Sequence, residues 1–263
     1  MSRSLRIARL GSVSLERLAA KADGQGRVHS VFDRAINVLW HDGRLLTLQG
    51  RTSLAAPFAV ALSALPPRGA VTPGMRIRSS HFDWERAETV ALEMPRGPLA
   101  FSADTLPEPS CARALASEAG LHARHALGKS LKGRDLSAFV DAVERLIGLG
   151  EGLTPAGDDC VVGALAAMHR LAPESFMKDR VRRDRLAEAA RKRTTDVARD
   201  FLLDALDGRF AEPVLALLTA RAGRLADLAV RDLLAMGATS GADTLTGIRL
   251  GCRALSASSA ALA

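Results

Sequence analysis

Hydrophobic and polar residues alternate in short runs over the first hundred residues, and proline or glycine separates the runs. The runs 35–40 and 45–48 flank His41-Asp42-Gly43-Arg44, which predicts a β-hairpin with an Asp-Gly turn. Further expected elements are strands at 75–78 and 89–93, a strand or a short helix at 58–62, and a helix at 15–22. Short strands with frequent turns predict a small antiparallel sheet or a partly closed barrel.

After residue 110 the hydrophobic residues recur at three- and four-residue spacing, as on one face of a helix. Ser110 is the expected cap of a first helix that runs to about His125. Further helices are expected at 136–147, 155–171, 179–192, 195–207, 212–220, 224–236 and 242–255. Eight of the eleven prolines lie before residue 110, so we place a domain boundary near 105–112. The expected fold class is α+β, with a β-rich half (1–109) packed on a helical half (110–263).

The most unusual segment is Gly148-Leu149-Gly150-Glu151-Gly152-Leu153-Thr154-Pro155-Ala156-Gly157-Asp158-Asp159. Its alternate glycines predict a loop whose backbone can approach a ligand closely. Thr154 and Pro155 predict a helix start with a hydroxyl N-cap and proline at the first helical position. Free N–H groups at such a start can bind an anion, although the Lys-Ser/Thr of a phosphate loop is missing. Asp158 and Asp159 fit a Mg²⁺ between carboxylate and phosphate, or a substrate amide or ammonium group, or mere stabilisation of the helix start.

A second segment repeats part of this pattern. G-x-D-x-x-x-G fits both Gly157–Gly163 and Gly241–Gly247. Asp159 and Asp243 each precede the second glycine by four positions and therefore share a helix face with it. Our hypothesis is that two helix starts are related by approximate symmetry and converge on one site; the alternative is chance similarity.

Three weaker candidates lie elsewhere. Thr194 or Thr195 is expected to cap a third helix start. Asn37, inside an apolar strand, is either a structural hydrogen-bond hub or a ligand contact. His122 and His125 lie one helical turn apart and either bind a metal or, without an acidic partner, are exposed to solvent.

Composition narrows the class of protein. Hydrophobic residues make up 48% and charged residues 25%, as in ordinary globular proteins. No apolar run approaches the roughly 20 residues of a membrane span, and no signal-peptide pattern is present, so we expect a cytoplasmic protein without a membrane partner. The three cysteines are too scattered for a disulfide framework or a zinc site and are expected to be buried thiols.

The net charge of +7 is concentrated in one segment. Residues 178–199 hold nine basic and four acidic residues, while the rest of the chain is nearly balanced. Aromatic residues for base stacking make up only 4% of the chain. Nucleic acid is therefore not an expected partner. A regulator that binds nucleic acid through residues 178–199 is nevertheless kept as an alternative function.

Four blocks of the sequence resemble the AllH family. They are 30–37, the glycine segment 148–159, Thr194-Thr195, and 238–247, so the resemblance covers nearly the whole chain. The family is named for a subunit of oxamate carbamoyltransferase, an enzyme of anaerobic allantoin breakdown. That enzyme converts oxalurate and phosphate into oxamate and carbamoyl phosphate.

The resemblance implies a subunit of a carbamoyltransferase-like enzyme that acts on a small ureido or carboxylate substrate, with partner subunits or as a homo-oligomer. Asp158, Asp159 and Asp243 are then the expected catalytic residues, which orient the carbamoyl NH₂ group or a Mg²⁺. The expected ligands of that Mg²⁺ are Asp158 and Asp159, and no other cofactor is expected. The residues expected to hold phosphate or carboxylate oxygens are Gly150, Gly152, Thr154, Gly157, Thr194, Thr195, Ser240, Gly241 and Asn37.

The chain departs from the family pattern at three places. The family has Pro at the position of Glu151, Ser at Ala156, and a His-Ser pair at Ala238-Thr239. Without that histidine no general base is expected at position 238, and a substrate other than oxalurate is an open alternative. The alternative to an enzymatic role is a non-catalytic subunit that binds a small anion or serves as a scaffold in a multi-subunit metabolic enzyme.

Overall fold

A computed structural model describes the chain except for residues 1–4, 21–23, 52–54, 173–178 and 261–263. Contacts divide the chain into two units, Met1–Leu92 and Glu93–Ala263, each with a hydrophobic core of its own. Residues 93–109, which the sequence assigns to the first half, share contacts with the second unit.

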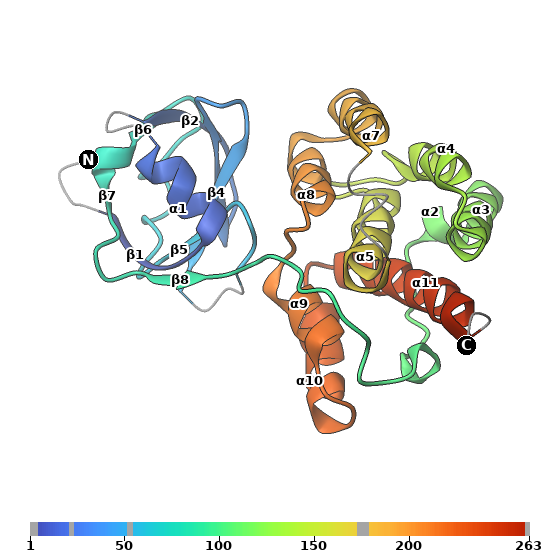
Figure 1. The fold of residues 1–263 in the computed structure, drawn as a ribbon. Coiled ribbons are helices and arrows are strands. Elements are labelled where there is room, and N and C mark those ends of the chain that lie inside the picture. The colour runs from blue at the N-terminus through green and yellow to red at the C-terminus, as the bar shows by residue number, and fades with distance from the viewer. Residues whose placement is uncertain (1–4, 21–23, 52–54, 173–178, 261–263) are drawn as a thin grey trace. The chain divides into compact units, whose positions relative to one another are not determined.

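The first unit is a mixed sheet that curls into a nearly closed barrel (Figure 1). Its elements are β1 (Leu5–Gly11), α1 (Ser12–Ala19), β2 (Gln25–Val31), β3 (Ala35–Trp40), β4 (Leu45–Gly50), β5 (Ala59–Leu62), β6 (Arg76–Arg78), η1 (Ser79–His81), β7 (Phe82–Asp83) and β8 (Glu88–Val90). The strand order is β6-β2-β3-β4-β5-β1-β7, and β8 pairs with β1. Because β5 pairs parallel to β4, and β7 and β8 pair parallel to β1, the sheet is mixed rather than purely antiparallel.

The predicted hairpin is present at β3 and β4. Gly43 has φ of +77°, and the Trp40 N–H donates to the Arg44 carbonyl at 2.8 Å across the turn. The 59–62 run is a strand and not a helix, and all four of its residues are buried. The expected helix at 15–22 begins earlier, at Ser12.

The second unit is helical (Figure 1). Its elements are η2 (Ala103–Thr105), α2 (Arg113–Ala116), α3 (Glu118–Gly133), α4 (Leu136–Leu146), α5 (Ala156–Leu171), α7 (Arg180–Arg193), α8 (Asp196–Leu206), α9 (Glu212–Thr219), α10 (Arg224–Leu234) and α11 (Ser240–Ala260). Every residue of α5 from Ala156 to Met168 is buried, so this helix lies at the centre of the unit. It packs against α11, α8, α9 and α4.

Three predicted helix starts have different outcomes. The expected cap at Ser110 is wrong, because the long helix begins at Glu118 and Ser117 accepts a hydrogen bond from the Gly120 N–H at 3.1 Å. The expected Thr154 cap is also wrong, because the extended backbone of Pro155 puts proline itself at the N-cap and leaves the Thr154 hydroxyl free to bond elsewhere. Thr195 does cap α8, through the Ala198 N–H at 3.1 Å.

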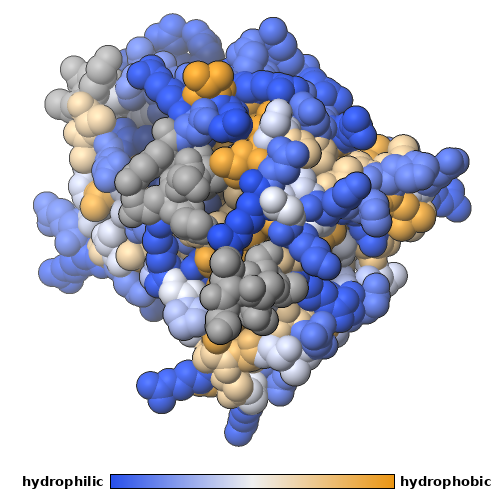
Figure 2. Space-filling view, turned by 45° about the vertical axis from the view of Figure 1, so that its right-hand side comes forward, coloured by the Kyte–Doolittle hydropathy of each residue, from blue (hydrophilic) through white to orange (hydrophobic). Residues whose placement is uncertain are grey.

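The basic segment is largely neutralised by its own surroundings. Arg185 pairs with Glu144 at 2.7 Å and with Asp141 at 2.8 Å, and Lys192 pairs with Glu188 at 2.9 Å. The face shown in Figure 2 is mostly hydrophilic, with hydrophobic residues in small areas between polar ones. Among the described residues, no helix combines the length and the apolar character needed to cross a membrane.

Candidate functional site

The two G-x-D-x-x-x-G motifs pack directly against each other in α5 and α11. A Cβ built at Gly163 would lie 2.0 Å from the Thr244 carbonyl oxygen, and one built at Gly247 would lie 1.9 Å from that of Cys160. Thr244 and Cys160 are the same position of the two motifs, so the contact is reciprocal. The glycines bring the two backbones into contact and place both helix starts at the same end of the pair.

The glycine loop before α5 is tightly folded. Gly148, Gly150 and Gly152 all have positive φ, at +79°, +122° and +93°. The Gly157 N–H donates to the Leu149 carbonyl at 2.8 Å, and the next two N–H groups donate to the Pro155 carbonyl. These three N–H groups at the start of α5 are therefore engaged within the chain, which leaves side chains as the groups that could bind a ligand here.

Asp158 joins three segments of the helical unit. Its carboxylate accepts hydrogen bonds from the Gly148 N–H at 2.9 Å and from the Thr194 hydroxyl. Burial raises its pKa to about 6, although both hydrogen bonds act in the opposite direction. With both oxygens engaged, Asp158 is suited to holding the loop and the α7–α8 connection in place.

Asp159 has a different environment from its neighbour. It is buried, and its Oδ2 atom has no hydrogen-bond partner among the described residues. Burial and the nearby Asp243 carboxylate raise its pKa well above the ordinary value, while the Ser240 and Thr154 hydroxyls lower it. Those two hydroxyls lie 2.7 Å apart and join the starts of α5 and α11. A buried carboxyl with an unused oxygen beside two hydroxyls can bind a polar ligand group.

Asp159 lines a partly enclosed cavity of about 200 Å³. Its walls are formed by Thr154, Asp159, Val162, Phe201, Arg209, Phe210, Ala211, Val214, Met236, Gly237, Ser240 and Thr244. Arg209 is the cation of this set and pairs with Asp207 at 2.9 Å. The volume is below the roughly 300–1,000 Å³ of pockets for drug-sized ligands, so it suits a small metabolite.

Family models match both units of the chain. The model described as oxamate carbamoyltransferase subunit AllH matches residues 146–252, and the model of the AllH family N-terminal domain matches residues 5–97. The chain belongs to the AllH family. No curated protein and no solved structure matches it. The AllH match includes every residue that lines the cavity of Asp159.

Asp243 does not line this cavity of the AllH-family chain. One of its oxygens accepts a hydrogen bond from the Ala112 N–H at 2.8 Å, and the other has no partner among the described residues. Burial raises its pKa. Asp159 and Asp243, which hold the same position in the two motifs, are therefore close to each other, but only Asp159 faces the cavity.

The other predicted binding residues mostly support the loop. Thr195 donates its hydroxyl hydrogen to the Leu153 carbonyl, in addition to its role as a cap. At Gly157 and Gly241, an added Cβ would lie 2.0 Å from the carbonyl oxygens of Leu146 and Leu233, respectively. These glycines therefore allow each helix start to pack against the end of an earlier helix.

Asn37 lies in the barrel unit and has a full set of structural partners. Its amide nitrogen donates to Ser30 at 3.1 Å, and its amide oxygen accepts from the Thr47 hydroxyl at 2.7 Å. These bonds join β2, β3 and β4, which favours the structural interpretation of this residue.

The fold adds no further ligand to the predicted Mg²⁺ site among the described residues. Within the described ranges there is no group of three His, Cys, Asp or Glu residues that could hold a metal ion. His122 and His125 are both exposed on α3. Asp158 and Asp159 thus remain the two predicted ligands of a Mg²⁺.

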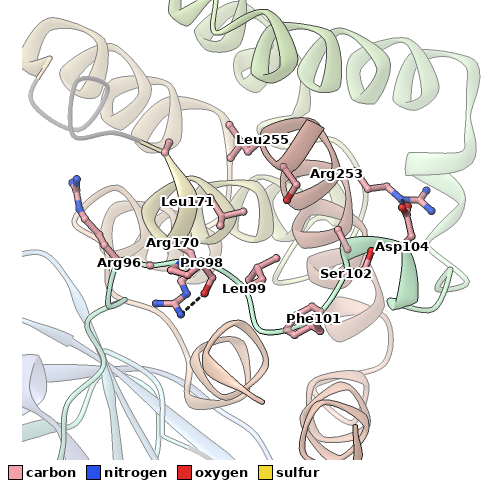
Figure 3. Close-up of a pocket in the computed structure, with 14 residues that line it drawn as sticks. Arg96, Pro98, Leu99, Phe101, Ser102, Asp104, Arg170, Leu171, Arg253 and Leu255 are labelled. Atoms are coloured by element: carbon pink, nitrogen blue, oxygen red, sulfur yellow. Dashed lines mark hydrogen bonds and ion pairs between the residues drawn. The ribbon is translucent and has the colours of Figure 1, made fainter. Parts of the chain in front are cut away.

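A second, wider hollow lies near the end of α5 (Figure 3). It measures about 1160 Å³, and its walls include Leu99, Phe101 and Leu255. Arg170 donates to the carbonyls of Pro95 and Pro98, each at 2.8 Å, and Arg253 pairs with Asp104 at 2.8 Å. This groove is a weaker candidate for chemistry than the cavity of Asp159, because its carboxylate, Asp104, is paired, whereas Asp159 keeps a buried oxygen without a partner among the described residues.

Sequence reasoning identified Asp159, Thr154 and Ser240 but missed the rest of the cavity. Arg209 and Phe210 lie between α8 and α9, and Phe201 lies on α8. No local motif marks these residues, because only the packing of α8 and α9 against α5 brings them to the site.

Proposed function

We propose that this chain is a subunit of an enzyme of the oxamate carbamoyltransferase type and that the cavity of Asp159 binds its small ureido or carboxylate substrate. The observation that carries the proposal is the unused, buried oxygen of Asp159 beside two hydroxyls and a cation in a partly enclosed cavity. Membership of the AllH family supplies the reaction class.

The polar groups of the cavity match the groups of a ureido acid such as oxalurate. The Arg209 guanidinium suits the carboxylate. One hydroxyl hydrogen of the Thr154–Ser240 pair is used in the hydrogen bond between them. The other can be donated to the carbamoyl oxygen, where negative charge develops during transfer. Apolar side chains such as Val162, Phe210 and Val214 form much of the wall, and low polarity around a bound ligand strengthens these interactions.

The transfer requires movement of one proton. An oxygen of hydrogen phosphate attacks the ureido carbonyl carbon, the bond from that carbon to the oxamate nitrogen breaks, and carbamoyl phosphate forms. The phosphate loses one proton and the oxamate nitrogen gains one, so the reaction needs no other source of protons. In our proposal Asp159, kept protonated by burial, donates to the leaving nitrogen and regains a proton from the attacking phosphate.

The first test is a thermal-shift titration of the full chain with oxalurate, oxamate, carbamoyl phosphate and phosphate. A ligand at about 100 times its Kd adds about 2.7 kcal/mol, which corresponds to a rise in Tm of several degrees. Asp159→Asn should reduce this rise, because the amide cannot supply the hydroxyl hydrogen of a protonated carboxyl group. The matched control is Asp227→Asn, at an exposed position on α10.

Activity of the enzyme reconstituted with its partner subunits separates catalysis from binding. Loss of turnover in Asp159→Asn with the complex intact supports the proposed role. Unchanged ligand binding and unchanged turnover in this variant would contradict it and favour the scaffold alternative.

A further inference from the structure

The contact between α5 and α11 has approximate twofold symmetry. Pairs of residues 84 positions apart, such as Ala167 and Gly251, lie opposite each other, and a Cβ built at Gly251 would lie 2.6 Å from that of Ala167. Asp159 and Val162 line the partly enclosed cavity on one side of the pair. Their counterparts are Asp243 and Thr246. By this symmetry, Thr246 takes the place of Val162 on the other side of the helix pair.

Thr246 lines a separate hollow of about 450 Å³ between α3 and α11, with no lining residue in common with the cavity of Asp159. The hollow is strongly basic. Its walls include Arg124, Lys132, Arg249 and Arg253 and one carboxylate, that of Glu108, while Arg253 is also paired with Asp104, which does not line the hollow. Like charges brought together in a concave site repel one another and are stabilised by a bound anion.

Two of these guanidinium groups have unused buried donors. Arg249 pairs with Glu108 at 3.1 Å, yet its Nε atom is buried with no partner among the described residues. Arg124 donates from Nη1 to the Leu115 carbonyl at 3.2 Å, and its Nε atom is likewise buried without a partner in the described part of the chain. A buried N–H without an acceptor is costly. Both arginines line the hollow, where an anion would pair with their guanidinium charge.

We propose that this hollow is a second anion site, distinct from the cavity of Asp159, and that it takes a phosphate group. Phosphate offers several acceptor oxygens and more than one negative charge, which matches donors that arrive from two helices. A single carboxylate would satisfy fewer of them. Burial raises the pKa of Asp243 and the nearby Arg124 charge opposes that rise, so the hollow and the start of α11 are electrostatically linked.

The probe is inorganic phosphate, titrated into the full chain and followed by ³¹P NMR. We expect saturable binding that weakens about tenfold or more in Arg124→Gln and in Arg249→Gln, since each variant removes charge-assisted hydrogen bonds. Arg231→Gln, which removes an exposed arginine from α10, is the charge-matched control and should bind as the wild type does. Arg249→Lys, which keeps the charge, should retain part of the affinity and shows that the fold survives substitution.

The same titration distinguishes the two sites. Phosphate is also a reactant in the proposed cavity of Asp159, so binding at two sites is expected in the wild type. Arg209→Gln, in that cavity, should leave unchanged the part of the binding that Arg124→Gln and Arg249→Gln weaken. Conversely, Arg249→Gln should leave the oxalurate-induced thermal shift unchanged, so either site can fail without the other. Absence of saturable phosphate binding, or a loss caused by Arg209→Gln alone, would overturn the second site.

Discussion

Asp158 and Asp159 are neighbours in the chain, but their carboxyl groups meet different surroundings. Asp158 accepts hydrogen bonds on both oxygens, from a backbone N–H and from Thr194. Asp159 keeps one buried oxygen without a partner and faces a cavity. The paired aspartates were evident in the sequence, but their division into a packing residue and a cavity residue depends on which side of α5 each occupies.

The raised pKa of Asp158 predicts a dependence of stability on pH. Because this pKa is about 6 in the folded chain against an ordinary 3.8, the folded state holds a proton that the unfolded state releases between these values. The contribution of Asp158 to stability therefore falls as pH rises through this window. Asp158→Asn keeps an acceptor for the Gly148 N–H and should gain up to about 3 kcal/mol relative to the wild type between pH 4 and pH 7.

Urea unfolding of both proteins at pH 4, 5, 6 and 7 measures this difference in the free energy of unfolding. A difference that stays constant across the series would show that Asp158 ionises with its ordinary pKa in the folded chain.

At the scale of elements, the close packing of α5 on α11 depends on small residues at the points of contact. Periodicity predicted both helices, and the repeated motif predicted that they are related. The caps were harder to predict, since Thr154 bonds across to Ser240 and not to its own helix. The hydroxyl of Thr154, which the local sequence pattern assigned to the helix cap, is instead used in a tertiary hydrogen bond.

We predict that Gly163→Ala destabilises the protein by about 1–3 kcal/mol or more. Its Cβ would lie 2.0 Å from a backbone carbonyl oxygen, which cannot yield without moving α11. Gly133→Ala, at the end of α3, is the matched control, because an added Cβ there meets nothing within 4 Å. Thermal unfolding of the two variants should show a lower Tm only for Gly163→Ala; equal values would refute a close helix contact at this glycine.

At the scale of the molecule, the α+β class and the helical half followed from the sequence, but the barrel did not follow in full. The strand β2 was missed because its buried positions include Gly26, which carries no hydrophobic signal, while Arg27 and His29 are exposed. The strand β1 was missed because Arg6 and Arg9 interrupt its apolar residues. Parallel pairing is set by distant partners, which short-range alternation cannot reveal.

The division into units predicts how fragments behave. Residues 93–109 contribute Met94, Ala103 and Leu106 to the core of the second unit. A fragment of residues 93–263 should therefore fold with a cooperative thermal transition, whereas 110–263 should have a clearly lower Tm because it loses these buried side chains. Circular dichroism melts of the two fragments measure this. Equal Tm values would instead support a boundary near residue 110.

The same-direction packing of α5 and α11 has an electrostatic consequence. Each helix carries a partial positive charge at its N-terminus, and in this pair the two positive ends lie together instead of cancelling, as they would in an antiparallel pair. Thr154, Gly237 and Ser240 line the cavity of Asp159 at these ends. Under the proposed function, a ligand that becomes more negative during reaction would lie where the fields of two helix dipoles add.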